Sequence, residues 1–159
     1  MSALSEEIKG KIREHFSRYP SKQAVTLPAL HMVQEKHGFV SNEAMKEIAE
    51  LLELSPAQIF DTMSFYGFFR DEKHPLGKKR VWICRSISCS LRGAEDVLRE
   101  ACERLHIAPG ETTSDGAMTI EYAECLGACD GAPCMLINDE LKERISVEDV
   151  LAEGNATHV

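Results

Sequence analysis

Hydrophobic residues in the first seventy positions recur at the spacing of α-helices. The first segment places an apolar side chain at every fourth residue, at Leu4, Ile8, Ile12 and Phe16. Three further helices are expected over residues 26–37, 41–52 and 55–63. The last of them begins with a capping box at Ser55, and Pro56 takes its first helical position. Because short turns join the four segments, we expect residues 1–70 to form a small helical bundle.

The second half of the chain follows a different pattern. Short runs of alternating apolar and polar residues predict strands over 80–84, 118–125, 135–137 and 141–145. An amphipathic helix is expected over residues 91–105, and Ser146 begins a final short helix. The order strand, helix, strand, strand, helix predicts a small α/β or α+β domain over residues 79–159. The polar residues 71–78 between the two parts are typical of a linker.

An aromatic segment lies at the end of the predicted bundle. Phe65-Tyr66-Gly67-Phe68-Phe69 holds four of the ten aromatic residues in the chain. The segment packs as part of a core, or it anchors a partner protein on the surface. We take residues 65–69, together with the bundle, as the expected docking surface.

Composition and charge narrow the function classes. The net charge of −8 argues against a nucleic-acid partner. Residues 1–78 hold 10 Lys/Arg and 11 Asp/Glu, whereas residues 79–159 hold 8 and 15, together with all six cysteines. No apolar run approaches the roughly 20 residues of a membrane helix, and the N-terminus has no signal-peptide pattern. We therefore expect a cytoplasmic protein without direct membrane insertion, and a reducing compartment disfavours structural disulfides among its cysteines.

Four cysteines form two close pairs, Cys84-x4-Cys89 and Cys125-x3-Cys129, each where a predicted strand runs into a loop. Two thiolate pairs from distant loops suit a [2Fe–2S] cluster, with one pair for each iron. A structural zinc site is the weaker alternative, because no C-x2-C knuckle occurs. The same absence removes the thioredoxin dithiol motif, and no His lies near either pair to form a Rieske centre.

Two cysteines remain outside these pairs. Cys102 lies on the apolar face of the helix predicted over 91–105, which is typical of a buried, inert thiol. Cys134 opens an apolar strand, which also favours burial. However, Cys129-x4-Cys134 repeats the spacing of the first pair, so Cys134 remains an alternative ligand.

These motifs together resemble a known family. The matching residues are Phe65-Tyr66, Cys84-Arg85-Ser86-Ile87-Ser88-Cys89, the run Ile107 to Gly116, and Cys125-Leu126-Gly127-Ala128-Cys129 with Asp130-Gly131-Ala132-Pro133 after it. The sequence resembles the E-type subunit of NADH-quinone oxidoreductase, the thioredoxin-like [2Fe–2S] ferredoxin family, over nearly its whole length. This resemblance implies a thioredoxin-like fold for residues 79–159. It also implies that Cys84, Cys89, Cys125 and Cys129 hold one [2Fe–2S] cluster.

The resemblance further implies a carrier that takes one electron from a flavin. FMN and NADH would be bound by a partner subunit of the F type, among other peripheral-arm subunits of respiratory complex I. The chain would then be peripheral to the membrane through the complex. Related subunits serve NAD-linked hydrogenases and formate dehydrogenases, and the sequence does not choose among these enzymes.

The chain itself shows no catalytic constellation. Its glycines make no phosphate-binding pattern, so the isolated chain is expected to turn over no substrate and not to oxidise NADH. Two functions of other classes remain as alternatives. One is a scaffold or binding module stabilised by zinc. The other is a thiol-dependent redox enzyme that uses Cys129 or Cys134.

Overall fold

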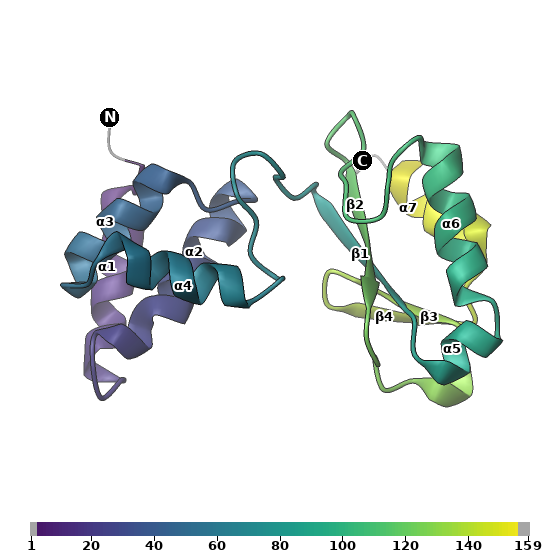
Figure 1. The fold of residues 1–159 in the computed structure, drawn as a ribbon, viewed down its shortest axis with the longest axis horizontal. Coiled ribbons are helices and arrows are strands. Elements are labelled where there is room, and N and C mark those ends of the chain that lie inside the picture. The colour runs from purple at the N-terminus through teal and green to yellow at the C-terminus, as the bar shows by residue number, and fades with distance from the viewer. Residues whose placement is uncertain (1–2, 156–159) are drawn as a thin grey trace. The chain divides into compact units, whose positions relative to one another are not determined.

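The structure is a computed structural model that describes residues 3–155 (Figure 1). It divides into two compact units, one ending at Pro75 and the other beginning at Leu76. We call the first the helical unit and the second the sheet unit. Each unit has its own cluster of buried hydrophobic side chains.

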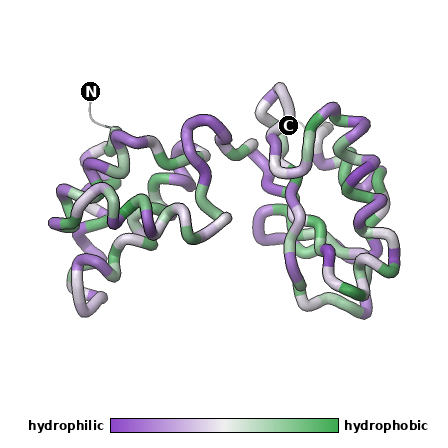
Figure 2. Tube along the Cα trace, viewed as in Figure 1, coloured by the Kyte–Doolittle hydropathy of each residue, from purple (hydrophilic) through white to green (hydrophobic). Residues whose placement is uncertain are grey.

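The helical unit contains four α-helices, with a 3₁₀ turn after the first and another before the second. They are α1 (Glu6–Glu14), α2 (Thr26–His37), α3 (Asn42–Leu52) and α4 (Pro56–Phe65). Figure 2 shows hydrophobic and hydrophilic residues interspersed along these helices, as expected where one face packs inward. The largest fully buried side chains of this unit are Leu4, Ile12, Val25, Leu30, Ile48, Leu52 and Ile59. The helical bundle expected from the spacing is therefore confirmed.

The helix boundaries follow local capping chemistry. The side chains of Ser5, Ser41 and Ser55 each accept a hydrogen bond from the backbone N–H three residues later. Ser55 and Gln58 complete the capping box, and Gly38 ends α2 in a left-handed conformation with a φ of 77°. These signals are local in the sequence, so pattern analysis finds them.

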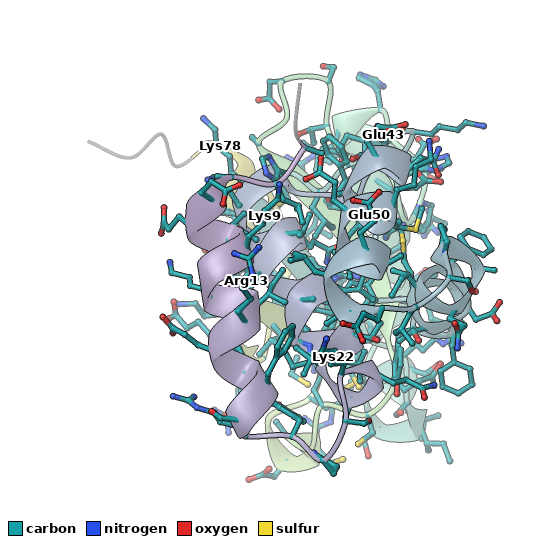
Figure 3. The ribbon with its side chains drawn as sticks, turned by 90° about the vertical axis from the view of Figure 1, so that its left-hand side faces the viewer. Lys9, Arg13, Lys22, Glu43, Glu50 and Lys78 are labelled. Atoms are coloured by element: carbon teal, nitrogen blue, oxygen red, sulfur yellow. The ribbon has the colours of Figure 1, made fainter. Side chains whose placement is uncertain are left out.

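Charged side chains line a surface groove between α1 and α3. Lys9 pairs with Glu47 at 3.0 Å, and this contact joins the two helices. Arg13 and Glu50 line the same groove, and Figure 3 shows them beside Lys9. The groove is lined by Glu6, Glu47 and Glu50 as well as by the two cations, so its charges largely offset one another.

The sheet unit contains a four-stranded mixed sheet with helices packed on it. Its strands are β1 (Lys79–Cys84), β2 (Met118–Ala123), β3 (Cys134–Ile137) and β4 (Glu140–Glu143), in the spatial order β2-β1-β3-β4. Strands β1 and β2 are parallel, and β3 pairs antiparallel with both β1 and β4. The helices are α5 (Ile87–Leu91), α6 (Ala94–Leu105) and α7 (Val147–Asn155). The predicted mixed α and β architecture of this half is confirmed.

One face of the sheet forms the core of this unit. Val81 and Ile83 of β1 are fully buried together with Leu98 of α6. Helices α6 and α7 cover the same side of the sheet in Figure 1. The connection from β1 through α6 to the parallel strand β2 is the crossover that parallel pairing requires.

One predicted helix is divided in the structure. The segment expected as a helix over 91–105 begins as α6 at Ala94, and the separate short helix α5 ends at Leu91. Gly93 lies between them with a φ of 87°, a left-handed conformation that breaks the helical path. Leu91 consequently faces solvent and does not join the apolar stripe of α6.

The start of β1 depends on a glycine. A Cβ atom at Gly77 would lie 2.8 Å from the backbone N of Met118 and 2.9 Å from its Cα and C atoms. We therefore expect Gly77→Ala to lower the unfolding free energy of the sheet unit by about 1–3 kcal/mol. Urea unfolding followed by the fluorescence of Trp82, the only tryptophan, reports on this unit. An unfolding free energy of the sheet unit in Gly77→Ala equal to that in the unchanged chain would contradict the prediction.

Candidate metal centre

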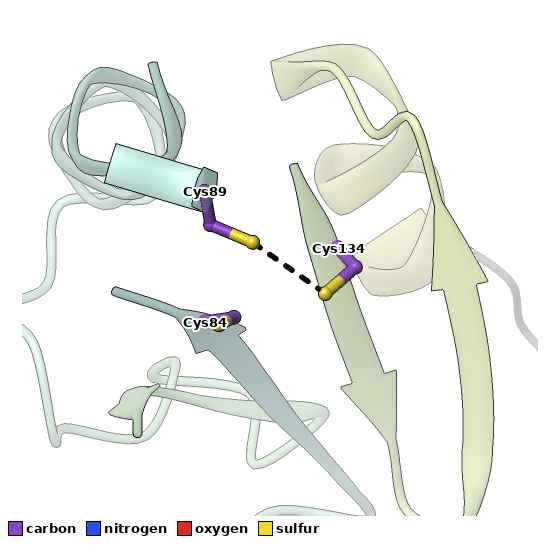
Figure 4. A group of neighbouring side chains, drawn as sticks. All are labelled: Cys84, Cys89 and Cys134. Atoms are coloured by element: carbon purple, nitrogen blue, oxygen red, sulfur yellow. Dashed lines mark hydrogen bonds between the residues drawn. The ribbon is translucent and has the colours of Figure 1, made fainter. Parts of the chain in front are cut away.

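Three cysteines from three different elements meet at one end of the sheet. Cys84 ends β1, Cys89 lies on α5, and Cys134 begins β3 (Figure 4). Their sulfur atoms all lie within 4.8 Å of one another, and all three side chains are buried. Cys89 Sγ and Cys134 Sγ are 3.7 Å apart.

Strand register explains why Cys134 lies there. Strands β1 and β3 pair antiparallel with Ile83 opposite Met135. One further step in the same register puts Cys84 opposite Cys134. Because nothing local in the sequence gives this register, the sequence alone leaves both roles of Cys134 open. Its predicted burial is confirmed, and its sulfur lies beside those of Cys84 and Cys89, as the ligand alternative requires.

The three thiols differ in the direction in which their surroundings shift the pKa. Burial raises the pKa of Cys84, but backbone N–H groups of Leu126 and Ser86 donate to its sulfur, and the net pKa lies below the usual value. Burial raises the pKa of Cys89. Burial and the neighbouring Cys89 raise the pKa of Cys134 to about 12. Cys84 is therefore the thiol whose surroundings best stabilise a thiolate.

The second predicted pair lies on the loop after β2. Cys125 and Cys129 are both exposed, and among the described residues they do not belong to the three-sulfur group. The Gly127 N–H donates to Cys125 Sγ at 3.4 Å, and Gly127 adopts a left-handed conformation with a φ of 82°. Because glycine adopts this conformation without strain, the loop can turn its backbone N–H toward the cysteine sulfur.

Several contacts hold the two cysteine loops side by side. Leu126, whose N–H donates to Cys84, lies between Cys125 and Cys129 in the sequence. Arg85, next to Cys84, donates its backbone N–H to Ala123 O at 2.9 Å and pairs with Glu124 at 2.5 Å. The two predicted cysteine pairs thus belong to adjacent loops at the same end of the sheet.

The remaining predicted features lie elsewhere. Cys102 is buried on α6, where burial raises its pKa to about 11, which fits an inert thiol. The aromatic segment is divided in the helical unit, since Phe69 is only 8% exposed and Phe65 is 80% exposed. Phe69 belongs to the core, so only part of residues 65–69 is available for docking.

Within the described residues, no helix is both long and apolar enough to cross a membrane.

The sheet unit is thus a mixed sheet with a cysteine-rich end, and it follows the helical unit in the chain. Residues 12–153 match the family described as thioredoxin-like [2Fe–2S] ferredoxin. The chain belongs to this family, and the predicted thioredoxin-like ferredoxin fold is thereby confirmed.

Curated relatives agree with this assignment. The chain is 37% identical over 131 residues to NADH-quinone oxidoreductase subunit 2 of Thermus thermophilus, covering 81% of this chain and 71% of that protein. It is 34% identical over 151 residues to the E-type subunit of the NADH-quinone oxidoreductase of Aquifex aeolicus, covering 92% of each. The resemblance to the E-type subunit is therefore confirmed.

A similar fold occurs as part of a longer chain in a solved structure. A chain of an NAD+-reducing [NiFe]-hydrogenase in the H2-reduced state superimposes with a TM-score of 0.72 at 24% identity. The match covers 84% of this chain but only 23% of the hydrogenase chain. This likeness concerns the fold alone.

The residues present fit a [2Fe–2S] cluster by their donor chemistry. Such a cluster takes four thiolates, with hydrogen bonds to the sulfurs adjusting its properties. This end of the sheet offers two neighbouring cysteine loops, and backbone N–H groups already donate to Cys84 and Cys125. The particular set Cys84, Cys89, Cys125 and Cys129 stays a prediction.

Proposed function

We propose that this chain is an electron-transfer subunit of an NADH-quinone oxidoreductase, respiratory complex I. It would carry one [2Fe–2S] cluster on Cys84, Cys89, Cys125 and Cys129. The observation that carries the proposal is the pair of adjacent cysteine loops, joined by the Leu126 N–H to Cys84 and by the Arg85–Glu124 ion pair. Membership of the [2Fe–2S] family and the names of the curated relatives support it.

The cluster, when bound, supplies one-electron redox chemistry without making or breaking bonds to a substrate. The chain contributes the ligands and their surroundings. Cys84 and Cys89 are buried and hold one side of the site away from water. The Leu126 and Ser86 N–H groups stabilise negative charge on Cys84. Cys125 and Cys129 are exposed, which leaves the other side open toward a partner.

The electron donor belongs to another chain in this proposal. FMN and NADH are bound by a flavin subunit of the F type, which passes one electron at a time to the cluster. The chain itself is a carrier without substrate turnover. Its location is the cytoplasm, peripheral to the membrane through the complex. The alternative is the equivalent subunit of an NAD-linked hydrogenase or formate dehydrogenase.

An NADH titration tests the carrier role. The full chain, reconstituted with iron and sulfide, is mixed with the flavin subunit under anaerobic conditions, and the visible cluster band is recorded. We expect NADH to bleach the band only when the flavin subunit is present. Bleaching of the chain alone, or no bleaching with the flavin subunit, would contradict the proposed role.

Besides the exposed part of residues 65–69, we expect the flavin subunit to contact the surface next to the cysteine loops. Ile87 and Leu91 are one turn apart on α5, beside Cys89, and are 80% and 83% exposed. Two such apolar side chains on a short surface helix are typical of an interface. An Ile87→Ser/Leu91→Ser double variant should bind the flavin subunit at least about tenfold more weakly while keeping its cluster.

The matched control for this docking test is Leu141→Ser on β4, another exposed leucine of the same unit. Binding is measured by co-purification and by titration of the two purified proteins. Unchanged binding by the double variant, or an equal loss with Leu141→Ser, would show that α5 is not part of the interface.

A further inference from the structure

A cysteine outside the predicted ligand set completes a compact group of three buried sulfurs. Cys134 lies within 4.8 Å of both Cys84 and Cys89, and its sulfur is 3.7 Å from that of Cys89. In a tetrahedral zinc–thiolate site with bonds of about 2.3 Å, neighbouring sulfurs are separated by about 3.8 Å. The sulfur positions therefore approximate one edge of a tetrahedral metal site.

We propose that Cys84, Cys89 and Cys134 bind a single thiophilic d10 cation, zinc or a softer ion, when the chain carries no cluster. This site goes beyond the proposed electron-carrier function and does not depend on it. A divalent ion that binds all three thiolates displaces three thiol protons to solvent. The resulting group carries one net negative charge, which is smaller than that of three bare thiolates.

The surroundings of the three sulfurs favour a soft cation over a hard one. All three donors are thiols, and soft thiolates select zinc, cadmium or copper(I) over magnesium or calcium. The backbone N–H groups of Leu126 and Ser86 donate to Cys84, which stabilises a metal-bound thiolate. The three elements that carry these cysteines are packed in the core of the sheet unit, so the site requires little rearrangement.

The proposed ion and the proposed cluster exclude one another. Both use Cys84 and Cys89, and these thiolates cannot serve two separate centres at once. Cys134 distinguishes the two, because it belongs only to the single-ion site. Cys125 and Cys129 belong only to the predicted cluster.

Cadmium titration of the full chain tests this site. The chain is reduced, freed of metal and titrated anaerobically with Cd²⁺, and thiolate-to-cadmium absorption in the near ultraviolet is recorded with a competing chelator. We expect one tight site per chain. Loss of a group that only hydrogen-bonds to a metal ligand weakens metal binding by about tenfold to a hundredfold. Cys134 would bind the metal directly, so Cys134→Ala should weaken Cd²⁺ binding by at least that much.

Three further variants separate this site from the cluster ligands. Cys125→Ala/Cys129→Ala should keep tight Cd²⁺ binding, and Cys102→Ala is the buried-cysteine control. Cys134→Val preserves an apolar side chain at the buried position, and Trp82 fluorescence checks that each variant is folded. The proposal is overturned if folded Cys134 variants bind Cd²⁺ as tightly as the unchanged chain. It is also overturned if the Cys125/Cys129 variant loses the tight site.

Discussion

Cys125→Ala is expected to reduce bound iron from about two atoms per chain to almost none. Cys125 is exposed on the loop after β2, so its removal should not disturb the core of the sheet unit. Alanine offers no ligand atom, and a [2Fe–2S] cluster with three protein thiolates lacks one of its four anchors. Iron and acid-labile sulfide assays of the anaerobically reconstituted chain measure the effect.

The control for this variant is Cys102→Ala, because Cys102 lies on α6 among the core residues and away from the three-sulfur group. It should keep full iron and sulfide. Retention of the cluster by Cys125→Ala, with loss in Cys134→Ala, would instead assign Cys134 as the fourth ligand. Such a result would contradict the predicted ligand set and leave the fold assignment intact.

Glu121→Ala is expected to destabilise the sheet unit by about 3 kcal/mol. The Glu121 carboxylate accepts hydrogen bonds from Arg80 Nε at 2.5 Å and from Trp82 Nε1 at 2.8 Å. The side chains of Arg80 and Glu121 are only 10% and 13% exposed. Removing the carboxylate takes away the counter-charge of a mostly buried guanidinium, which water cannot fully solvate. Urea unfolding followed by Trp82 fluorescence measures this loss.

A second ion pair of the sheet unit supplies the comparison. Arg85 and Glu124 also approach to 2.5 Å, but their side chains are 52% and 77% exposed. Because exposed pairs are screened by water, Glu124→Ala should change unfolding of the sheet unit little. Equal destabilisation by the two variants would show that burial of the Arg80–Glu121 pair does not matter.

Local chemistry made much of the fold predictable. The helices of the first unit were indicated by apolar spacing and by serine caps at positions such as Ser41 and Ser55. The strands of the second unit were indicated by alternation. Apolar spacing, serine caps and alternation each involve residues close together in the sequence, so the sequence alone shows them.

Features that depend on tertiary register were not predictable in the same way. Cys134 meets Cys84 because β1 and β3 pair in one particular register. Phe69 is buried while Phe65 is exposed because the chain turns after α4, which composition does not reveal. The left-handed Gly93 separated α5 from α6, and a helical pattern that tolerates glycine did not show this break.

The most direct test of the proposed carrier is an anaerobic assay of iron, sulfide and zinc on the full chain, with visible spectra before and after dithionite. We predict about two irons and two acid-labile sulfides per chain, with a brown colour that bleaches on reduction. A colourless chain that holds one zinc, and that takes up no cluster after reconstitution with iron and sulfide, would contradict the electron-carrier account.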